Sequence, residues 1–208
     1  MDISQERVEK TIKALRKNGF VVDYFAHKEE ALQFLLAQME PGKTVGTGGS
    51  ITLEEINLLT AAQEKGLQVI DRKPAGATPA QKKEATMHAI FSDYFFCSAN
   101  AITEEGEIYN VDGMGNRLAA LVYGPENTYI VAGINKIVPD FPAAVKRVEE
   151  VAAPKNVLRL KRDNPCSKTG HCMDCRVDGR ICCAYLLLKR PMMGRTMHVV
   201  LIGEELGY

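Results

Sequence analysis

Residues 93–119 read DYFFCSANAITEEGEIYNVDGMGNRLA, and this stretch predicts the centre of the fold. The apolar run from Tyr94 to Cys97, which ends at Ser98, is typical of a buried central strand. Residues 100–113 then predict two short strands with a turn near Glu105-Gly106, and a helix is expected from about residue 115 to residue 122. A polar stretch directly after a central strand lies where ligands bind in open α/β sheets.

Helices and strands are predicted to alternate on both sides of this stretch. A helical stripe formed by Val8, Ile12 and Leu15 opens the chain, and further helices are predicted to start at Thr52, Thr78 and near Asp140. Thr52 and Glu55 have the spacing of a capping box, and Thr78-Pro79 has that of an N-cap followed by proline. The other strands are expected at residues 20–26, 44–47, 67–71, 128–133, 156–160 and 197–203.

This alternation predicts an α/β fold with a mostly parallel sheet flanked by helices. At 208 residues the chain is expected to form a single domain, residues 1–208. Residues 164–183, rich in cysteine and turn-forming residues, are expected to be an insertion within it. We call these residues the thiol segment.

Charge and hydropathy exclude several classes of partner. Lys plus Arg and Asp plus Glu number 26 each, so no basic excess is present to neutralise the phosphates of a nucleic acid. No apolar run approaches the length of a membrane span, and the charged N-terminus lacks the apolar region of a signal peptide. The sequence therefore predicts a cytoplasmic protein without nucleic-acid or membrane partners, and it leaves a homo-oligomer open.

The segment VGTGGSIT, residues 45–52, is a glycine-rich turn between a predicted strand and a predicted helix. Gly46, Gly48, Gly49 and Ser50 are candidate ligand-binding residues, because glycines let the backbone approach a ligand and a helix start favours an anion. A tight connection that needs positive φ angles explains the same pattern equally well.

A second candidate site combines Asn100, Asn110, Asp112, Asn116 and Arg117. Arg117 is the expected partner of a small anionic ligand, since a guanidinium matches a carboxylate or a phosphate in a fork. Asp112 is the candidate catalytic residue, as an acid/base or as the acceptor of a hydroxyl. The alternative is that asparagine and aspartate beside glycine form turns, and that the arginine is a solvated helix residue.

Lys136 follows the predicted strand 128–133, on the same expected edge of the sheet. It is a candidate second cation for an acidic ligand. The alternative is a solvated surface lysine.

Four cysteines of the thiol segment, Cys166, Cys172, Cys175 and Cys182, are the candidate metal ligands. Two residues between Cys172 and Cys175 let one turn present both sulfurs to one metal, and four thiolates suit tetrahedral zinc or an iron–sulfur cluster. A redox dithiol and a group of free thiols are the alternatives, and disulfides rank behind them in a reducing compartment. Cys97, in an apolar strand, is expected to be a buried small hydrophobe.

Four segments together resemble the LUD-domain family of lactate-utilisation proteins over nearly the whole chain. They are GTGGSITLEEI, SANAITEEGEIYNVDGMGNRLAALVYGP, VAGINKIV and VVLIGEELGY. The cysteine pattern is similar to that of a stand-alone subgroup of this family. The resemblance implies a fold like that of ribose-5-phosphate isomerase and the CoA-transferases, and a role near lactate oxidation beside an iron–sulfur redox partner protein.

Three functions follow as hypotheses. The first is a redox-associated protein that binds a small organic anion and an iron–sulfur cluster. The second is a stand-alone isomerase- or transferase-like enzyme acting on a phosphate or a CoA ester. The third is a ligand-binding module with a structural zinc.

Overall fold

The computed structural model describes residues 4–72 and 75–208. The α-helices are α1 (Gln5–Lys17), α2 (Lys28–Ala37), α3 (Ile51–Glu55), α4 (Leu58–Glu64), α5 (Pro79–Ile90), α6 (Asn116–Tyr123), α7 (Phe141–Arg147), α8 (Ala153–Arg159) and α9 (Pro165–Thr169). The 3-10 helix η1 (Ile134–Lys136) and the π-helix η2 (Val148–Ala152) complete the helical elements. The strands are β1 (Val21–Phe25), β2 (Thr44–Thr47), β3 (Gln68–Val69), β4 (Tyr94–Cys97), β5 (Ala101–Thr103), β6 (Ile108–Asp112), β7 (Asn127–Gly133), β8 (Ile137–Val138), β9 (Ala184–Leu188) and β10 (Met197–Ile202).

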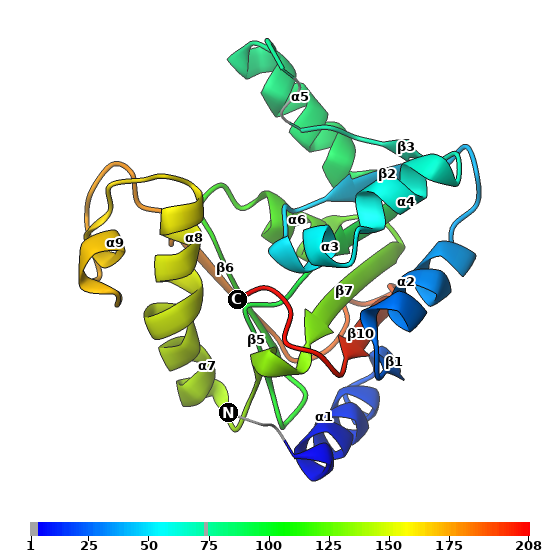
Figure 1. Cartoon of the computed structure of the whole chain (residues 1–208), viewed down its shortest axis with the longest axis horizontal. Coiled ribbons are helices and arrows are strands. Elements are labelled where there is room, and N and C mark those ends of the chain that lie inside the picture. The colour runs from blue at the N-terminus through cyan, green and yellow to red at the C-terminus, as the bar shows by residue number, and fades with distance from the viewer. Residues whose placement is uncertain (1–3, 73–74) are drawn as a thin grey trace.

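A six-stranded sheet forms the body of the molecule, in the order β1-β10-β7-β4-β2-β3, and every pair in it is parallel. This confirms the predicted α/β fold with a mostly parallel sheet flanked by helices (Figure 1). The last strand, β10, lies between β1 and β7 rather than at the edge.

The two faces of this sheet carry separate apolar cores, because successive side chains of a strand point to opposite faces. Tyr94 and Phe96 of β4 pack in the core that α2, α3 and α4 cover. Phe95 and Cys97 pack in the core that α1, α6 and the second sheet cover. Cys97 is fully buried, as predicted.

The second sheet has four strands in the order β8-β5-β6-β9, with antiparallel β5-β6 and β6-β9 pairs. The turn at Glu105-Gly106 joins β5 to β6, as predicted from residues 100–113. Tyr109 and Val138 of this sheet pack against Ala144, Val148 and Ala153 of the α7–η2–α8 helix. The helix therefore forms an outer layer (Figure 1).

The prediction of a strand at residues 156–160 is wrong, because these residues lie in α8 and at its C-cap. Within this segment Val157 is 1% exposed whereas Leu158 is 58% exposed, so only one face of the helix is buried. A short apolar run cannot distinguish a strand from a helix by periodicity alone. The sequence analysis also did not predict β9, the strand that follows the thiol segment.

Two of the three predicted N-cap residues cap their helices in the structure. Thr78 caps α5 in a capping box with Gln81, and Asp140 caps α7, both as expected. The capping box at Thr52 and Glu55 is wrong, since Ser50 is the N-cap and its hydroxyl accepts from the Leu53 N–H.

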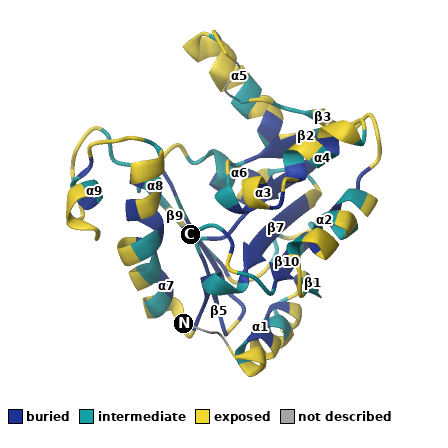
Figure 2. Cartoon of the chain, in the orientation of Figure 1, coloured by how far each residue is buried: buried dark blue, intermediate teal, exposed yellow. Residues whose placement is uncertain are grey.

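Helix α5 projects from the body (Figure 1) and is largely exposed along its length (Figure 2). Across residues 4–72 and 75–208, no helix combines the length and the apolar character that crossing a membrane requires.

Candidate functional site

Three neighbouring parallel strands, β2, β4 and β7, end in polar sequence. Residues 48–50 follow β2, residues 98–100 follow β4, and Asn135-Lys136 follow β7. Since β4 pairs in parallel with both β2 and β7, these segments lie at one edge of the sheet. We call Thr52, Ser98, Asn100, Asp112, Arg117 and Lys136 the strand-end cluster.

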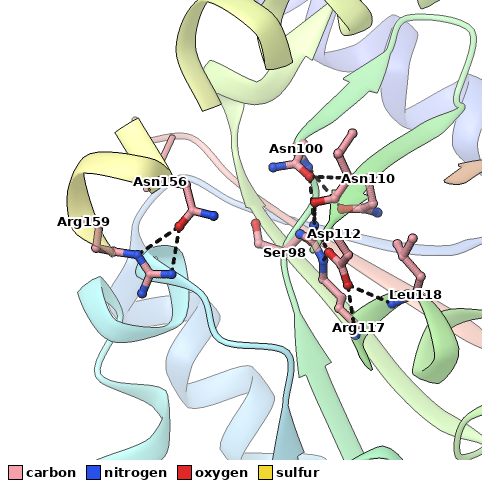
Figure 3. Close-up of polar contacts among 9 residues, drawn as sticks. Ser98, Asn100, Asn110, Asp112, Arg117, Leu118, Asn156 and Arg159 are labelled. Atoms are coloured by element: carbon pink, nitrogen blue, oxygen red, sulfur yellow. Dashed lines mark hydrogen bonds and ion pairs between the residues drawn. The ribbon is translucent and has the colours of Figure 1, made fainter. Parts of the chain in front are cut away.

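Asp112 and Arg117 form a nearly buried ion pair in this cluster. Arg117 Nε and Nη2 donate to Asp112 Oδ1 at 2.9 and 2.6 Å, and both side chains are nearly buried. The other oxygen, Asp112 Oδ2, accepts from the backbone N–H groups of Arg117 and Leu118 (Figure 3). Asp112 therefore anchors the start of α6 as well as the guanidinium.

The remaining donors of Arg117 also meet protein acceptors. Arg117 Nη1 donates to Ser98 O at 3.1 Å, and Nη2 donates to Asn100 Oδ1 and Val111 O, both at 2.9 Å. Figure 3 shows this arginine at the junction of β4, β6 and α6. The acid/base role of Asp112 and the anion-binding role of Arg117 remain predictions, because in this structure the two side chains bind each other.

The asparagines of the prediction differ in their surroundings. Asn100 Oδ1 accepts from the Val111 N–H at 2.9 Å, and Asn110 Oδ1 accepts from the Asn100 N–H at 3.2 Å. The Nδ2 atoms of Asn110 and Asn116 are buried, and no acceptor among the described residues satisfies them. Such groups are costly to leave unpaired, so a polar ligand or a water molecule would find donors here.

Lys136 is 2% exposed. Its Nζ lies 2.7 Å from Ser98 Oγ and 2.8 Å from Thr52 Oγ1, and no carboxylate of the described residues is within ion-pair distance. Burial, followed by the charges of Arg147 and Arg117, lowers the pKa of this amine to about 7. Sequence reasoning found Lys136 and missed its two hydroxyl partners, whose only signal is that Ser98 directly follows β4 and that Thr52 lies in α3, the helix after β2.

Arg147 of α7 is a second functional candidate that sequence reasoning missed. Its Nη1 donates to Asn100 O at 2.6 Å and its Nε donates to Asn135 O at 3.1 Å. Burial lowers its pKa to about 10, and among the described residues it forms no ion pair. In the sequence it is one of two adjacent basic residues on a helix, a pattern typical of a solvated face.

The glycines of the 45–52 turn each accommodate a neighbour. A Cβ on Gly46 would lie 2.0 Å from Ala89 O, and one on Gly48 would lie 2.9 Å from Arg117 Cβ. Gly49 has a φ of +82°, and a Cβ there would lie 2.8 Å from Arg72 Nη2. Packing therefore accounts for these glycines, and their binding of a ligand remains a prediction, as it does for Ser50.

The last residues of the chain, 203–208, lie over Lys136. Asn135 Oδ1 accepts from the Leu206 N–H at 3.1 Å, and Glu55 Oε2 accepts from the Gly207 N–H at 2.6 Å. A Cβ on Gly207 would lie 2.6 Å from Thr52 Oγ1 and 3.2 Å from Lys136 Nζ. Tyr208 donates its hydroxyl to Asn156 Oδ1 of α8, so this C-terminal tail bridges α3 and α8.

The thiol segment forms a separate candidate site. All four predicted metal ligands, Cys166, Cys172, Cys175 and Cys182, line one cavity of about 20 Å³ against Ala153 and Val157 of α8. Cys166 is buried and the other three are half-buried, and all four are free thiols. Within residues 4–72 and 75–208, no three His, Cys, Asp or Glu side chains are arranged closely enough to hold a metal ion as they stand.

Hydrogen bonds hold the thiol segment around this cavity. The N–H of Cys172 donates to Glu149 O, a carbonyl of the π-helix η2, at 2.8 Å. Arg180 donates to Cys175 O at 2.6 Å and to Cys182 O at 2.7 Å, joining two stretches of the segment.

Two donors also point at sulfur. The Asp174 N–H lies 3.4 Å from Cys172 Sγ, and Asn164 Nδ2 lies 4.0 Å from Cys175 Sγ. Such N–H···S contacts around metal-bound cysteines tune and orient the ligands.

The four thiols influence one another electrostatically. Burial raises the pKa of Cys182 to about 11, and the neighbouring thiols Cys172, Cys166 and Cys175 add to the increase. The pKa of Cys166 is raised by burial first and then by Cys175 and Cys172. A bound cation would favour the thiolate forms of these groups, and metal binding by the four cysteines remains a prediction.

A second cavity of about 70 Å³ adjoins the first and shares Ala153, Cys172 and Cys182 with it. Tyr109, Glu149 and Tyr185 are among its other lining residues.

Two residues of the segment lie apart from these cavities. His171 and Cys183 are exposed and line neither of them. Cys183 therefore serves as a matched control for the four lining cysteines.

The family model of the LUD domain matches residues 8–202. No curated protein matches the sequence.

Solved structures resemble the chain at low identity. A DUF162 family protein from Deinococcus radiodurans is 15% identical, with a TM-score of 0.55, over 97% of this chain and 99% of that chain. This likeness supports the fold alone. Two further structures match a smaller part of the chain, each with a TM-score of 0.35. One is eIF2B beta from Chaetomium thermophilum, at 18% identity over 56% of this chain and 44% of that chain. The other is ribose 5-phosphate isomerase A from Methanocaldococcus jannaschii, at 16% identity over 62% of this chain and 66% of that chain.

Proposed function

The chain belongs to the LUD domain family, and on that premise we propose that it is a redox-associated component of organic-acid utilisation. In this proposal the thiol segment holds an iron–sulfur cluster, and the strand-end cluster binds a small organic anion such as lactate. An iron–sulfur partner protein exchanges electrons with the cluster.

One observation carries this proposal. Four cysteines spread over residues 166–182 line one small cavity, whereas the fifth cysteine of the segment, Cys183, is exposed outside it. Consecutive side chains of an extended segment point to opposite sides, which explains why Cys183 lies outside the cavity that its neighbour Cys182 lines. A shared ligand would explain why the other four cysteines meet at one cavity.

The surroundings of the cavity offer groups that would orient the ligands of a cluster. A cluster held by four cysteines supplies one-electron transfer. Asn164, Asp174 and Arg180 would orient its ligands through the contacts described above. Three of the four sulfurs belong to half-buried residues, so the site lies near the surface, where a partner protein can approach.

The anion half of the proposal is supported by uncompensated charge. Lys136 and Arg147 lie near one another after β7 and at the end of α7, and the carboxylate whose charge acts on Lys136 is that of Glu55. Buried cations without a paired carboxylate favour an anionic ligand. Asn110, whose Oδ1 accepts from the Asn100 N–H, adds a buried Nδ2 donor beside the strand-end cluster.

Metal analysis of protein purified without oxygen tests the proposal. We expect iron and acid-labile sulfide in equal amounts, with broad absorption near ~400 nm, as thiolate-bound clusters give. Cys175→Ser should lose most of the iron, whereas Cys183→Ser should retain the wild-type content. Stoichiometric zinc without iron would instead support the structural-zinc module, and the absence of both metals would overturn the proposal.

A further inference from the structure

Lys136 occupies an unusual position for a lysine. Its amine is buried at the ends of β7, β4 and β2 and touches two hydroxyls, Ser98 Oγ and Thr52 Oγ1. An ion-paired lysine would have a carboxylate at this distance, and a solvated lysine would be exposed. Neither structural explanation accounts for this geometry.

Charged and titratable groups from four elements surround the amine. Arg147 of α7 and Arg117 of α6 favour its neutral form, whereas Glu55 of α3 and Cys97 of β4 favour its charged form. Burial adds to the effect of the two arginines and is the largest contribution. The pKa is consequently lowered to about 7 from 10.5.

This environment changes the chemistry of the side chain. With a pKa near 7, about half of the amine is neutral at pH 7, against roughly one part in three thousand for an ordinary lysine. A neutral, desolvated amine beside other cations is the form in which lysine attacks carbonyl groups. In its neutral form Lys136 therefore matches a carbonyl carbon, and a carboxylate on the same molecule matches the cations beside it.

Arg147 supplies the complementary group. Its guanidinium donates to the carbonyl oxygens of Asn100, a member of the strand-end cluster that follows β4, and of Asn135, which precedes Lys136 in η1. No contact with an acceptor is present at its Nη2 among the described residues. That nitrogen can therefore take a carboxylate oxygen.

We infer that Lys136 is a reactive amine that forms an imine with a small carbonyl compound carrying a carboxylate, and that Arg147 binds the carboxylate. The inference deepens the anion-binding half of the proposed function and does not depend on the metal centre. The substrate class is that of the smallest oxo acids, because the amine lies in a closely packed region.

The step is balanced without any further reactant. The neutral amine adds to the carbonyl carbon, so a C–N bond forms and the carbonyl oxygen becomes a hydroxyl by taking a proton. Loss of that hydroxyl as water then gives the imine. The hydroxyls of Ser98 and Thr52, within 2.8 Å of Nζ, are placed to relay the protons.

The C-terminal tail controls access in this arrangement. Gly207 lies directly over the amine, and its backbone is held by Asn135 and Glu55 rather than by the core. Leu206 before it is buried, so removal of residues 207–208 would uncover Lys136 without taking a side chain from the core.

Reductive trapping in the intact protein tests the inference. The protein is incubated at pH 7.5 with glyoxylate or pyruvate and cyanoborohydride, and labelled lysines are located by peptide mass mapping. We expect one dominant adduct, at Lys136, formed at least about tenfold faster than at any exposed lysine, because the neutral fraction differs by more than that. Removal of residues 207–208 should accelerate labelling.

Matched variants test whether Lys136 forms the adduct and whether Arg147 binds the carboxylate. Lys136→Met should abolish the dominant adduct, whereas Lys146→Met, at an exposed lysine of α7, should leave it unchanged. Arg147→Gln should reduce the preference for glyoxylate over acetaldehyde, which lacks a carboxylate. Acetate should compete with glyoxylate without forming an adduct.

Two results would overturn the inference. One is labelling in both chains that is no faster at Lys136 than at the exposed lysines, and the other is an unlabelled Lys136 even after removal of residues 207–208. Both can be read from the wild-type and shortened chains, so the test does not depend on whether a Lys136 variant folds. Repeating the trapping on Cys175→Ser separates this outcome from failure of the metal centre.

Discussion

The strand-end cluster and the thiol segment are built on opposite principles. In the cluster, Asp112 and Arg117 satisfy each other and the adjacent backbone, on elements fixed by a parallel sheet. In the thiol segment, the four cysteines have few protein partners, and the backbone around them is mostly irregular. The comparison indicates that the fold preorganises the first site, whereas the second would gain rigidity from the ligand that we propose for it.

The largest effect is expected on removal of metal. Chelation under anaerobic conditions should raise amide hydrogen exchange across residues 164–183 and leave residues 127–133 of β7 unchanged, because metal binding and local folding are coupled in such sites. Exchange mass spectrometry on the metal-loaded and the stripped protein measures this. Equal exchange in both forms of the segment would mean that the fold alone rigidifies it.

The next effect concerns the ion pair of the strand-end cluster. Arg117→Met should lower the free energy of unfolding by about 3–5 kcal/mol, since it leaves the nearly buried Asp112 carboxylate without its partner. Urea denaturation measures the loss, and Arg7→Met, at a more exposed pair with Glu104, is the control, with an expected loss of at most about 1 kcal/mol. Similar losses in the two variants would mean that the Asp112–Arg117 pair stabilises the fold no more than an exposed ion pair does.

The amine of Lys136 predicts a pH dependence of stability. Its pKa is lowered to about 7 in the folded state, whereas the unfolded chain has the ordinary value of 10.5, so the unfolded state binds more protons between these values. Stability should therefore rise with pH in this window. From pH 7 to pH 9 the wild type should gain about 2 kcal/mol relative to Lys136→Met.

Parallel curves of unfolding free energy against pH for the two proteins would show that Lys136 keeps its ordinary pKa. That result would also weaken the case for its reactivity. Lys146→Met is a suitable control, because this exposed lysine should leave the curve unchanged.

The smallest effect concerns the start of α3. Ser50→Ala should cost about 1 kcal/mol, because the Ser50 hydroxyl accepts the Leu53 N–H. Ser4→Ala is the matched control, since Ser4 is the N-cap of α1 and makes no side-chain hydrogen bond there. Thermal denaturation of both variants measures the difference, and equal losses would argue against the cap at Ser50.

Much of the main sheet was predictable because its strands are apolar and bounded by clear turn signals. Tyr94–Cys97 and the turn at Glu105-Gly106 are examples. The second sheet was not predicted as a separate layer, because its strands are short and pairing between distant segments leaves no local signal. The strand prediction for residues 156–160 was wrong for a related reason. Over five residues, the apolar pattern of a helix with one buried face is the same as that of a short strand.

The candidate sites show the same division. Local spacing identified Cys172 and Cys175, and the position after β7 identified Lys136. Spacing could not identify Ser98 and Thr52 as partners of Lys136, because only the parallel order of β7, β4 and β2 brings them together. Nor could it reveal that Arg117 already has acceptors within the protein.

The π-helix at Val148–Ala152 couples the outer helix to the thiol segment in a way that depends on chain length. A π turn amounts to one extra residue in an α-helix, so deleting a single residue there would restore regular winding. Everything beyond the deletion would then rotate by about 100°, the angle between successive residues of an α-helix. Ala153 and Val157 would turn away from the cysteines they now face, and the carbonyl that accepts from Cys172 would return to the helix. The geometry of the cysteine cavity is thus set by the register of a helix that contributes no sulfur to it.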